Sequence, residues 1–235
     1  MEIRYTSIQR KPSHEALPNG KIRIYYDEIE STETASHRDE DSGEETEDTY
    51  PVYLYRVVDA DALVASSIIV ALIRAEYSAD DELAIQRQRD DKPQEYNEYN
   101  AYAEWCKAYA ACVVGGYTLD TAKGLKVAEL GRYDASDAVN EFYINGNGTW
   151  LSPNRRNNLK SACESLKEKG EEVVPFMGMT IPVDTALEML SQIESYAATC
   201  ALVTENHAAT IMTKRTIKTV ESYDFTTGYP AKLSF

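Results

Sequence analysis

The chain has 235 residues, 43% of them hydrophobic, and a formal net charge of −15 at pH 7. This length is enough for one large domain or two small ones with a buried core, and we expect two. The negative charge argues against sequence-independent binding to nucleic acid and against attraction to anionic membranes, because both depend on Lys and Arg contacting phosphates.

The negative charge is concentrated in one segment. Residues 27–48 contain eleven Asp or Glu and one Arg, a net charge of −10, which leaves −5 for the rest of the chain.

The N-terminus lacks the apolar stretch of a secretory signal, and the longest apolar run, residues 63–73, is about half as long as a bilayer span. The four cysteines show no C-x-x-C spacing. We therefore expect a soluble protein with reduced, buried thiols in a cytoplasmic compartment.

The N-terminal part is predicted to be a small antiparallel sheet. Residues 3–8, 21–29 and 52–58 alternate in polarity and are rich in Ile, Val and Tyr, which predicts three strands. Between the second and third strands, residues 30–49 are acidic and contain Ser, Thr and Gly. Because this segment lacks apolar side chains to bury, we interpret it as a mobile surface loop.

Three helices are predicted to follow the sheet. From Asp61 the apolar period changes from two to 3.6, which indicates a helix that covers the sheet. Ser78 begins a short helix through a capping box, with Leu83 and Ile85 facing inward. Pro93 then begins a longer helix, since proline is tolerated in a first turn.

Two glycines, Gly115 and Gly116, mark the expected hinge between two units. Residues 1–114 are assigned to a strand-rich N-terminal unit with helices, and residues 115–132 to a linker with a short helix. Residues 133–235 are assigned to a C-terminal domain. The expected fold class is α+β, with two hairpins and one long C-terminal helix in the second unit.

Turn and capping residues define the C-terminal unit. Hairpins are predicted at residues 139–151, around a Gly/Asn-rich turn, and at residues 173–183, around Met177 and Gly178. Between them, Ser152 as N-cap and Pro153 at the first helical position predict a helix that ends near Gly170. An apolar stripe with helical spacing then predicts a helix of about thirty residues from 184 to 215, and a short helix follows near residues 216–222.

The residues alone predict no catalytic, cofactor or metal site. The three histidines fall in three different elements, and we interpret His207 as a hydrogen-bonded packing residue. The acidic run at 39–48 does not match the EF-hand spacing, which favours a solvated loop over weak cation binding. Asp59 and Asp61 lie between a strand and a helix, so we interpret them as capping residues and not as a catalytic carboxylate pair.

Tyrosine is abundant, with seventeen residues in the chain. Five aromatic residues follow Pro93 at helical spacings: Tyr96, Tyr99, Tyr102, Trp105 and Tyr109. This ladder is a candidate interaction surface for a partner protein or a sugar, since Tyr supplies a large contact area at a low cost in conformational entropy. Packing against the sheet or the second unit is the favoured interpretation of the ladder.

Two stretches carry a family resemblance. Residues 77–100, YSADDELAIQRQRDDKPQEYNEYN, resemble a segment that recurs in tail-region proteins of phages and prophages. Residues 133–235 are similar to a phage-associated domain of unknown function and to the C-terminal part of some tail-fibre assembly proteins. The second resemblance is carried by Tyr133, Asp134, Val139, Asn140, Phe142, Asn145, Gly146, Trp150, Leu151, Arg156, Ile193, Glu194, Tyr196, Ala197, Cys200, His207 and the run YDFTTGYP at 223–230.

The resemblance implies a non-enzymatic phage protein that acts through protein contacts. Its expected partners are other tail or fibre proteins, without nucleic acid or membrane insertion, and a homo-oligomer is compatible with it. The expected location is the tail region of the virion, after synthesis in the host bacterial cytoplasm. A structural or adaptor component is the leading hypothesis. The alternatives are a tail-fibre assembly chaperone and a protein that binds or cleaves cell-surface glycans. The family supplies no catalytic residues, and the acidic segment departs from its pattern.

Overall fold

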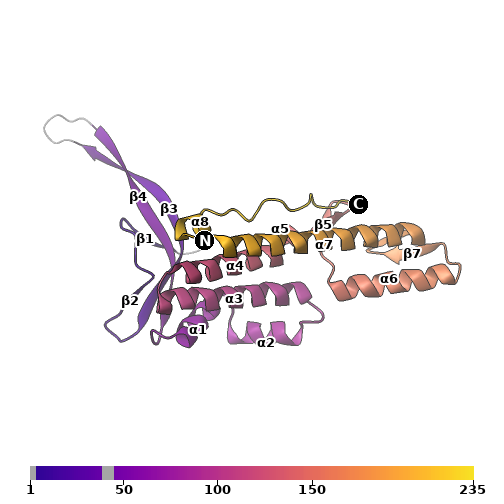
Figure 1. The fold of residues 1–235 in the computed structure, drawn as a ribbon, viewed down its shortest axis with the longest axis horizontal. Coiled ribbons are helices and arrows are strands. Elements are labelled where there is room, and N and C mark those ends of the chain that lie inside the picture. Colours follow the sequence, from indigo (N-terminus) through magenta and orange to yellow (C-terminus); the bar gives the residue numbers. More distant parts are fainter. Residues whose placement is uncertain (1–3, 39–44) are drawn as a thin grey trace.

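The computed structural model of the chain describes residues 4–38 and 45–235. An antiparallel four-stranded sheet lies at one end of an elongated stack of helices, and two small hairpins lie toward the other end (Figure 1). A long helix runs beside them near the C-terminus. This arrangement confirms the predicted α+β class.

The sheet has the strand order β1-β4-β3-β2, and each neighbouring pair is antiparallel. Its two central strands are long, whereas the edge strands contain three residues each. The strands are β1 (Tyr5–Ser7), β2 (His14–Ala16), β3 (Ile22–Arg38) and β4 (Glu45–Ala60). The three predicted strands are confirmed, and β2 is an addition that is too short to give a periodic signal.

The prediction of an irregular acidic loop at residues 30–49 is wrong where the structure describes the segment. Both sides of it are strand, and β3 and β4 stay paired from Glu30↔Tyr53 out to the last described residues. Residues 39–44, which hold part of the predicted loop, lie outside the described residues. The strands form because the segment is rich in Thr, a residue with high β propensity.

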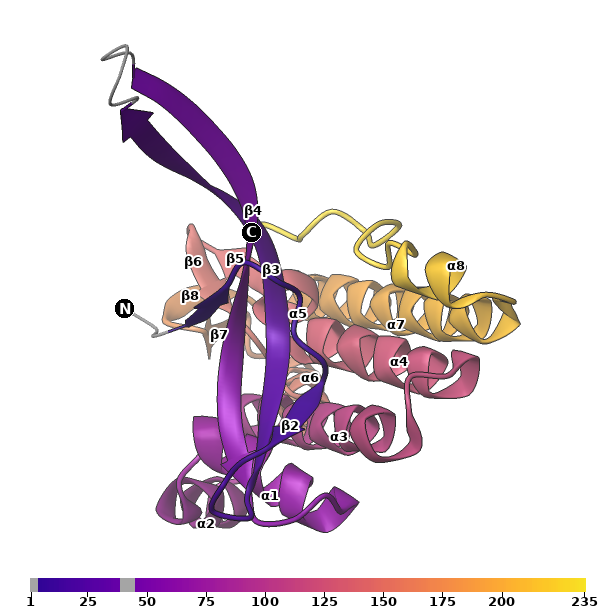
Figure 2. The same cartoon turned by 90° about the vertical axis from the view of Figure 1, so that its left-hand side faces the viewer.

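A β-bulge marks the point at which this hairpin leaves the body. The register shifts between Tyr26 and Ile29, and Asp27 has a φ of 49°. The Arg4 side chain donates a hydrogen bond to the Asp27 carbonyl oxygen at 2.8 Å. A bulge bends its strand and increases the twist, and Figures 1 and 2 both show the outer part of the hairpin projecting away from the helices.

Helices cover one face of the sheet. Ile24 and Tyr26 of β3 pack with Ile68 and Leu72 of α1 (Ala65–Glu76) and with Trp105 of α3 (Pro93–Gly115) in one core. This confirms a covering helix after the third predicted strand.

The short helix α2 (Ala79–Arg87) joins α1 to α3 and begins with the predicted capping box. The Ser78 side chain accepts from the Asp81 amide, and the Asp81 carboxylate accepts from the Ser78 amide. The prediction that Leu83 faces inward is wrong, because its side chain is 48% exposed. No residue of α2 is buried, since the helix lies at the edge of the stack.

The short helix expected within residues 115–132 is present and is longer than predicted, as α4 (Leu119–Ala135). Leu125 packs against the core of the sheet and α3, while Ala122 and Leu130 pack with Ile211 and Val220 from the C-terminal part of the chain. Gly116, with a φ of 83°, forms the turn between α3 and α4. The predicted hinge is therefore a tight helical connection, and α4 lies between the two expected units.

The remaining elements follow the predicted order. They are α5 (Asp137–Asn140), β5 (Phe142–Ile144), β6 (Asn147–Thr149), α6 (Pro153–Glu168), β7 (Val173–Phe176), β8 (Met179–Pro182), α7 (Val183–Thr213) and α8 (Ile217–Glu221). Both hairpins and all three helices predicted for this region are confirmed. Val139 is the exception, because it lies in α5 and not in a strand; its side chain is buried beside Tyr196 and Cys200.

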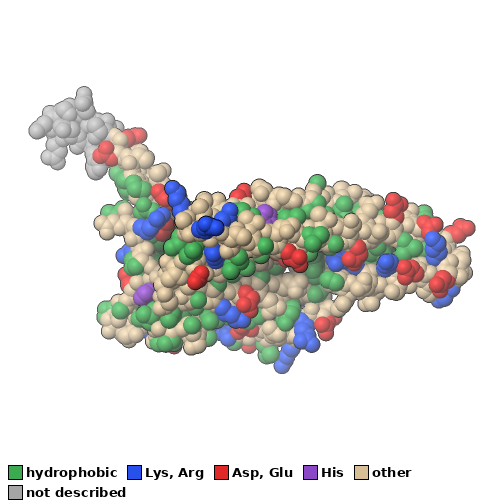
Figure 3. All heavy atoms as spheres, in the orientation of Figure 1, with side chains coloured by type: hydrophobic (Ala, Val, Ile, Leu, Met, Phe, Trp, Pro, Cys, Tyr) green, Lys and Arg blue, Asp and Glu red, His purple; other side chains and the backbone are tan. Residues whose placement is uncertain are grey.

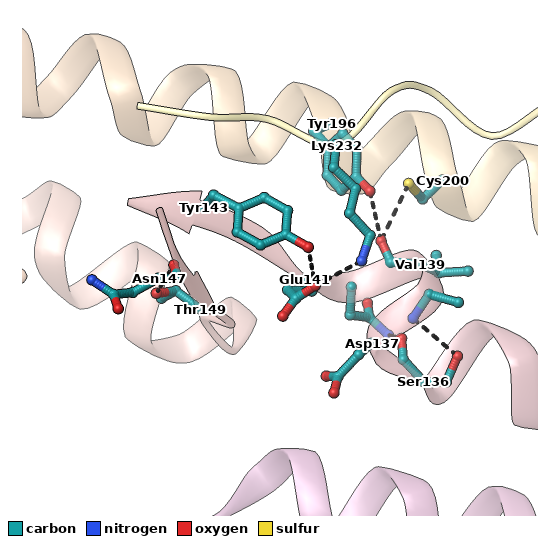
Figure 4. Close-up of polar contacts among 12 residues, drawn as sticks. Ser136, Asp137, Val139, Glu141, Tyr143, Asn147, Thr149, Tyr196, Cys200 and Lys232 are labelled. Carbon is teal, nitrogen blue, oxygen red and sulfur yellow. Dashed lines mark hydrogen bonds and ion pairs between the residues drawn. The ribbon is translucent and has the colours of Figure 1, made fainter. Parts of the chain in front are cut away.

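A network of polar contacts joins α5, β5 and α7 to the end of the chain (Figure 4). The Tyr196 hydroxyl donates to the Val139 carbonyl oxygen at 2.8 Å, and Glu141 accepts from Lys232 and from Tyr143, both at 2.8 Å. The last residues run parallel to β5, with a bridge between Tyr143 and Ser234. This C-terminal segment covers the outer edge of β5.

Candidate functional site

The aromatic ladder of α3 faces the interior over most of its length. Tyr99, Tyr102 and Trp105 are 8%, 4% and 3% exposed, and Tyr96 and Tyr109 are partly buried. The ring centroids of Tyr102 and Trp105 lie 5.7 Å apart, and those of Trp105 and Tyr109 lie 5.2 Å apart, both in stacked arrangements. The ladder therefore packs against the sheet and does not form an exposed platform.

Hydrogen bonds fix three of these tyrosines. Tyr102 donates to the Leu72 carbonyl oxygen at 2.9 Å, Tyr109 donates to the carbonyl oxygen of Tyr25, and Tyr99 donates to the Glu82 carboxylate. Burial raises the pKa of Tyr102 far above its ordinary value and raises that of Tyr99 to about 12. Both hydroxyls therefore remain protonated donors at neutral pH.

One end of the ladder reaches a cleft of about 750 Å³ between the sheet and the α3–α4 turn. The residues around this cleft come from the segment that leads into β2, the bulge of β3, the strand β4, the end of α3, the α3–α4 turn and one side of α4. The aromatic residues that line it are Tyr25, Tyr26, Tyr55, Trp105, Tyr109 and Tyr117. Of the five ladder residues, the structure brings Trp105 and Tyr109 into this cleft.

The carboxylates around the cleft are already engaged by cations. Asp27 lies 3.6 Å from Arg56, Glu28 lies 2.8 Å from Arg10, and Glu129 lies 3.4 Å from Lys126. The rings are engaged as well: the Arg132 guanidinium lies 5.1 Å from the Trp105 ring centroid, and Lys11 lies 5.7 Å from that of Tyr25. The cleft therefore offers aromatic contact area with little unpaired charge.

The cysteines and His207 take part in packing and hydrogen bonding within the fold. All four cysteines are free and buried, as predicted, and burial raises the pKa of each thiol, to about 12 for Cys106. His207 lies 2.7 Å from the Tyr223 hydroxyl and 2.8 Å from the Thr227 carbonyl oxygen, which confirms its prediction as a hydrogen-bonded packing residue. Within residues 4–38 and 45–235, no group of three or more His, Cys, Asp or Glu could hold a metal ion.

The two aspartates at the start of the first helix do not cap it. Asp59 accepts two hydrogen bonds from Arg23, at 3.0 and 3.3 Å, and Asp61 lies 3.1 Å from Lys21. The helix begins at Ala65, its N-cap is Val64, and no side chain caps it. The capping prediction is therefore wrong, because the aspartates lie too far before the helix and instead pair across the sheet.

The projecting part of the β3–β4 hairpin is the second candidate surface, which we call the ribbon: residues 30–36 of β3 and 47–52 of β4. It carries four carboxylates and no Lys or Arg. Glu30, Glu33, Glu47 and Asp48 lie opposite Tyr53, Tyr50, Ser36 and Ala35, respectively. Because like charges directly opposite one another destabilise a sheet, this register lets an acidic hairpin form.

Both edges of the ribbon lack a neighbouring strand within the part of the chain that the structure describes. On one side, β2 pairs only with residues 22–24 of β3, and on the other, β1 pairs only with residues 53–55 of β4. Before Val52, no described side chain of the ribbon is buried. The ribbon therefore presents two faces and two strand edges to a partner.

Sequence reasoning missed the ribbon because it weighed composition over cross-strand pairing. One local signal was available: Thr32, Thr34 and Thr49 share one face with Pro51, and the Thr34 and Thr49 hydroxyl oxygens lie 3.3 Å apart. Thr at alternate positions, as at Thr32 and Thr34, is typical of a strand.

Comparison of the chain with protein-family models, with curated proteins and with solved structures finds no match. Among the described residues, no helix is both long enough and apolar enough to cross a membrane.

Proposed function

We propose that the chain is a non-enzymatic component of a bacteriophage tail region that acts through protein contacts. The observation that carries this proposal is the ribbon, a two-stranded arm of roughly 20 Å, from the usual rise per strand residue. The arm leaves the body and has no strand along either edge within the described residues. Such an arm contributes little to the core of its own chain and is suited to strand addition or to lying on a neighbouring protein.

The family resemblance supplies the biological setting for this proposal, since it covers the α2–α3 region and the C-terminal domain. The body provides a rigid mount: helices α3, α4 and α7 share cores that connect the sheet to the C-terminal region. An arm fixed to a rigid body sets the position of a partner, which is the task of a structural or adaptor component.

A tail-fibre assembly chaperone is the second candidate, and the same strand edges favour it, because a chaperone can cover an exposed strand of an unfinished fibre. The two candidates differ in whether the protein remains in the particle.

Quantitative mass spectrometry on purified phage particles tests the proposal. We expect a fixed small copy number of this chain per tail, in multiples of three or six. The matched variant replaces residues 32–51 by Asn-Gly, which closes the hairpin at the Ser31↔Val52 pair with a two-residue turn. Circular dichroism should show that this variant folds. We expect purified particles to lack the variant.

Two results would contradict the structural proposal. If the protein is plentiful in infected cells but absent from particles, and fibres become insoluble without it, the chaperone function replaces it. If the shortened variant enters particles as well as the natural chain, the ribbon is not the attachment arm.

A further inference from the structure

One local departure from the acidic character of the protein lies at the end of α7. From Asn206 to Val220 the sequence contains no Asp or Glu and three basic residues, Lys214, Arg215 and Lys218. Lys123 of α4 lies close to this segment along the backbone, because the adjacent Ala122 packs with Val220 of α8 in one core cluster. We call these four residues the cationic patch. Figure 3 shows Lys and Arg side chains gathered over α8 at the sheet end of the molecule.

The charges of the patch have few internal partners. Lys123, Arg215 and Lys218 take part in no side-chain hydrogen bond or ion pair among the described residues, and Arg215 and Lys218 are exposed. Lys214 lies 4.5 Å from the Tyr223 ring centroid. Arg23, Arg156 and Lys232, in contrast to these three, each pair with a carboxylate. The patch is therefore available to an external anionic surface.

The ribbon has the complementary charge. Glu47 and Asp48 are exposed and have no side-chain partner within the described residues, and Glu33 contacts only the Tyr50 hydroxyl, at 3.4 Å. In Figures 1 and 2 the ribbon points away from α8 of its own chain. Only a second molecule can bring a ribbon and a cationic patch together.

We propose that the ribbon of one molecule docks on the cationic patch of a second copy of this chain. This inference rests on the proposed role of the ribbon as a binding arm and names its partner. The ribbon and the patch are different surfaces, so the contact is heterologous, and each bound copy leaves one ribbon and one patch available for the next. Repetition produces a closed ring, or a filament if the rotation does not close.

Charge alone would make this contact weak, since an exposed ion pair contributes about 0.2–1 kcal/mol. Apolar surface is present on both sides: Met212 is 57% exposed at the end of α7, next to the patch, and the ribbon carries Tyr50 and Pro51 outside the core. Self-association that depends on concentration and weakens with salt is the expected behaviour.

Sedimentation velocity on the full-length protein, over a concentration series at about 0.05 and about 0.5 M NaCl, tests the contact, because this range shortens the Debye length several-fold. We expect the average mass to rise with protein concentration and to fall with added salt. A ribbon variant, E33K/E47K/D48K, and a patch variant, K123E/R215E/K218E, should each weaken self-association roughly tenfold or more.

The decisive step is to mix the two variants. The reversed ribbon of one variant matches the reversed patch of the other, and the remaining surfaces keep their natural charges, so the mixture should associate again. The matched controls are R155E/K160E/K169E and E168K/E171K/E172K. These six residues lie in or just after α6, are exposed and form no ion pair within the described residues. The controls change net charge by the same amounts and should associate like the natural chain.

The outcomes separate this inference from the proposed function. If the natural chain stays monomeric at its highest soluble concentration in low salt, or if the mixture does not associate, the inference is wrong. The proposed function stands in that case if the shortened ribbon variant still fails to enter particles. If the control variants also lose self-association, net charge and not the ribbon–patch contact controls it, and the inference fails.

Discussion

The ribbon and the β5–β6 hairpin differ in what lies along their outer edges. The last residues of the chain cover the edge of β5: Tyr143 donates its amide to the Leu233 carbonyl oxygen and accepts from the Phe235 amide, both at 2.9 Å. In contrast, the ribbon has no strand along residues 30–36 or 47–52 within the described part of the chain. The chain thus closes one strand edge with its own backbone and leaves a longer one accessible.

The side chains follow the same division. The β5–β6 hairpin carries Phe142 and Ile144, which are 1% and 5% exposed, whereas most of the ribbon before the buried Val52 consists of Glu, Asp, Thr and Ser. Charged residues on an open edge oppose uncontrolled strand pairing. An accessible edge with charges of one sign therefore permits contact with a complementary surface and disfavours contact with another ribbon.

The largest expected effect on stability comes from removing the C-terminal segment that covers the edge of β5. Deleting residues 231–235 removes three backbone hydrogen bonds to β5 and its turn, and also the packing of Leu233 and Phe235 on the core. We expect the free energy of unfolding to fall by roughly 3–5 kcal/mol, measured by urea denaturation.

The matched comparison is the shortened ribbon variant, in which Asn-Gly replaces residues 32–51. No described side chain in that range is buried, so we expect a change of less than about 1 kcal/mol. The contrast between the two edges fails if shortening the ribbon costs as much stability as deleting the C-terminal segment.

A smaller loss is expected from Tyr196→Phe. The Tyr196 hydroxyl donates to the Val139 carbonyl oxygen at 2.8 Å in a buried position that joins α7 to α5. Removing the donor leaves a buried carbonyl with one partner fewer, and we expect a loss of about 1–2 kcal/mol in thermal or urea unfolding. Tyr96→Phe is the control, because the Tyr96 hydroxyl has no partner within the described residues. Equal losses in the two variants would refute the assigned role of the hydrogen bond.

The ion pair at the covered edge should appear in the acid dependence of stability. The hydrogen bonds from Lys232 and Tyr143 hold the Glu141 carboxylate ionised and lower its pKa. Its contribution to stability is therefore present above the unfolded-state pKa, near 4.3, and is lost as the pH falls through the lower folded-state pKa. Urea titrations across the acid range measure the free energy of unfolding as a function of pH. Glu141→Gln and Lys232→Met should each weaken the dependence of this free energy on pH in the acid range. If neither substitution changes that dependence, the pair does not act in this way.

The smallest effect is expected in the ribbon itself. Ala35→Glu places a carboxylate opposite Asp48, and like charges in a cross-strand pair cost about 0.2–1 kcal/mol. Faster amide hydrogen exchange should be confined to residues 30–36 and 47–52, with the global unfolding temperature unchanged, because the ribbon lies outside the core. Ala35→Gln keeps the size without the charge and is the control. A shift of the whole unfolding transition would show that the ribbon is coupled to the core.

Local signals predicted the elements whose structure depends on neighbours in the sequence. The Ser152 side chain accepts from the Arg155 amide, and Pro153 follows it at the start of α6, as the sequence indicated. The capping box of Ser78 and the turn at Met177 and Gly178, with φ values of 49° and 81°, are further examples. Caps and tight turns are determined by a few adjacent residues, so they can be predicted from the sequence without knowledge of the fold.

Predictions that required knowledge of a distant partner were wrong or incomplete. Residues 115–132 were predicted to be a linker with a short helix, whereas α4 spans Leu119–Ala135 and has apolar residues on several faces. Those faces pack against α3 on one side and against α7 and α8 on the other. For the ladder, helical spacing favoured packing but left an exposed interaction surface open, and the structure shows that Tyr99, Tyr102 and Trp105 are buried.

The amino-acid sequence by itself determined the α+β class, the long C-terminal helix, both small hairpins and the acidic character of residues 27–48, since periodicity, turn residues and charge are local properties. Only the tertiary structure decided that the described part of this acidic segment is a paired ribbon, that within the described residues its edges lack a neighbouring strand while that of β5 is covered, and that α4 packs beside the basic segment around α8. Strand pairing and surface charge both depend on residues far apart in the chain, and these come together only when the chain folds.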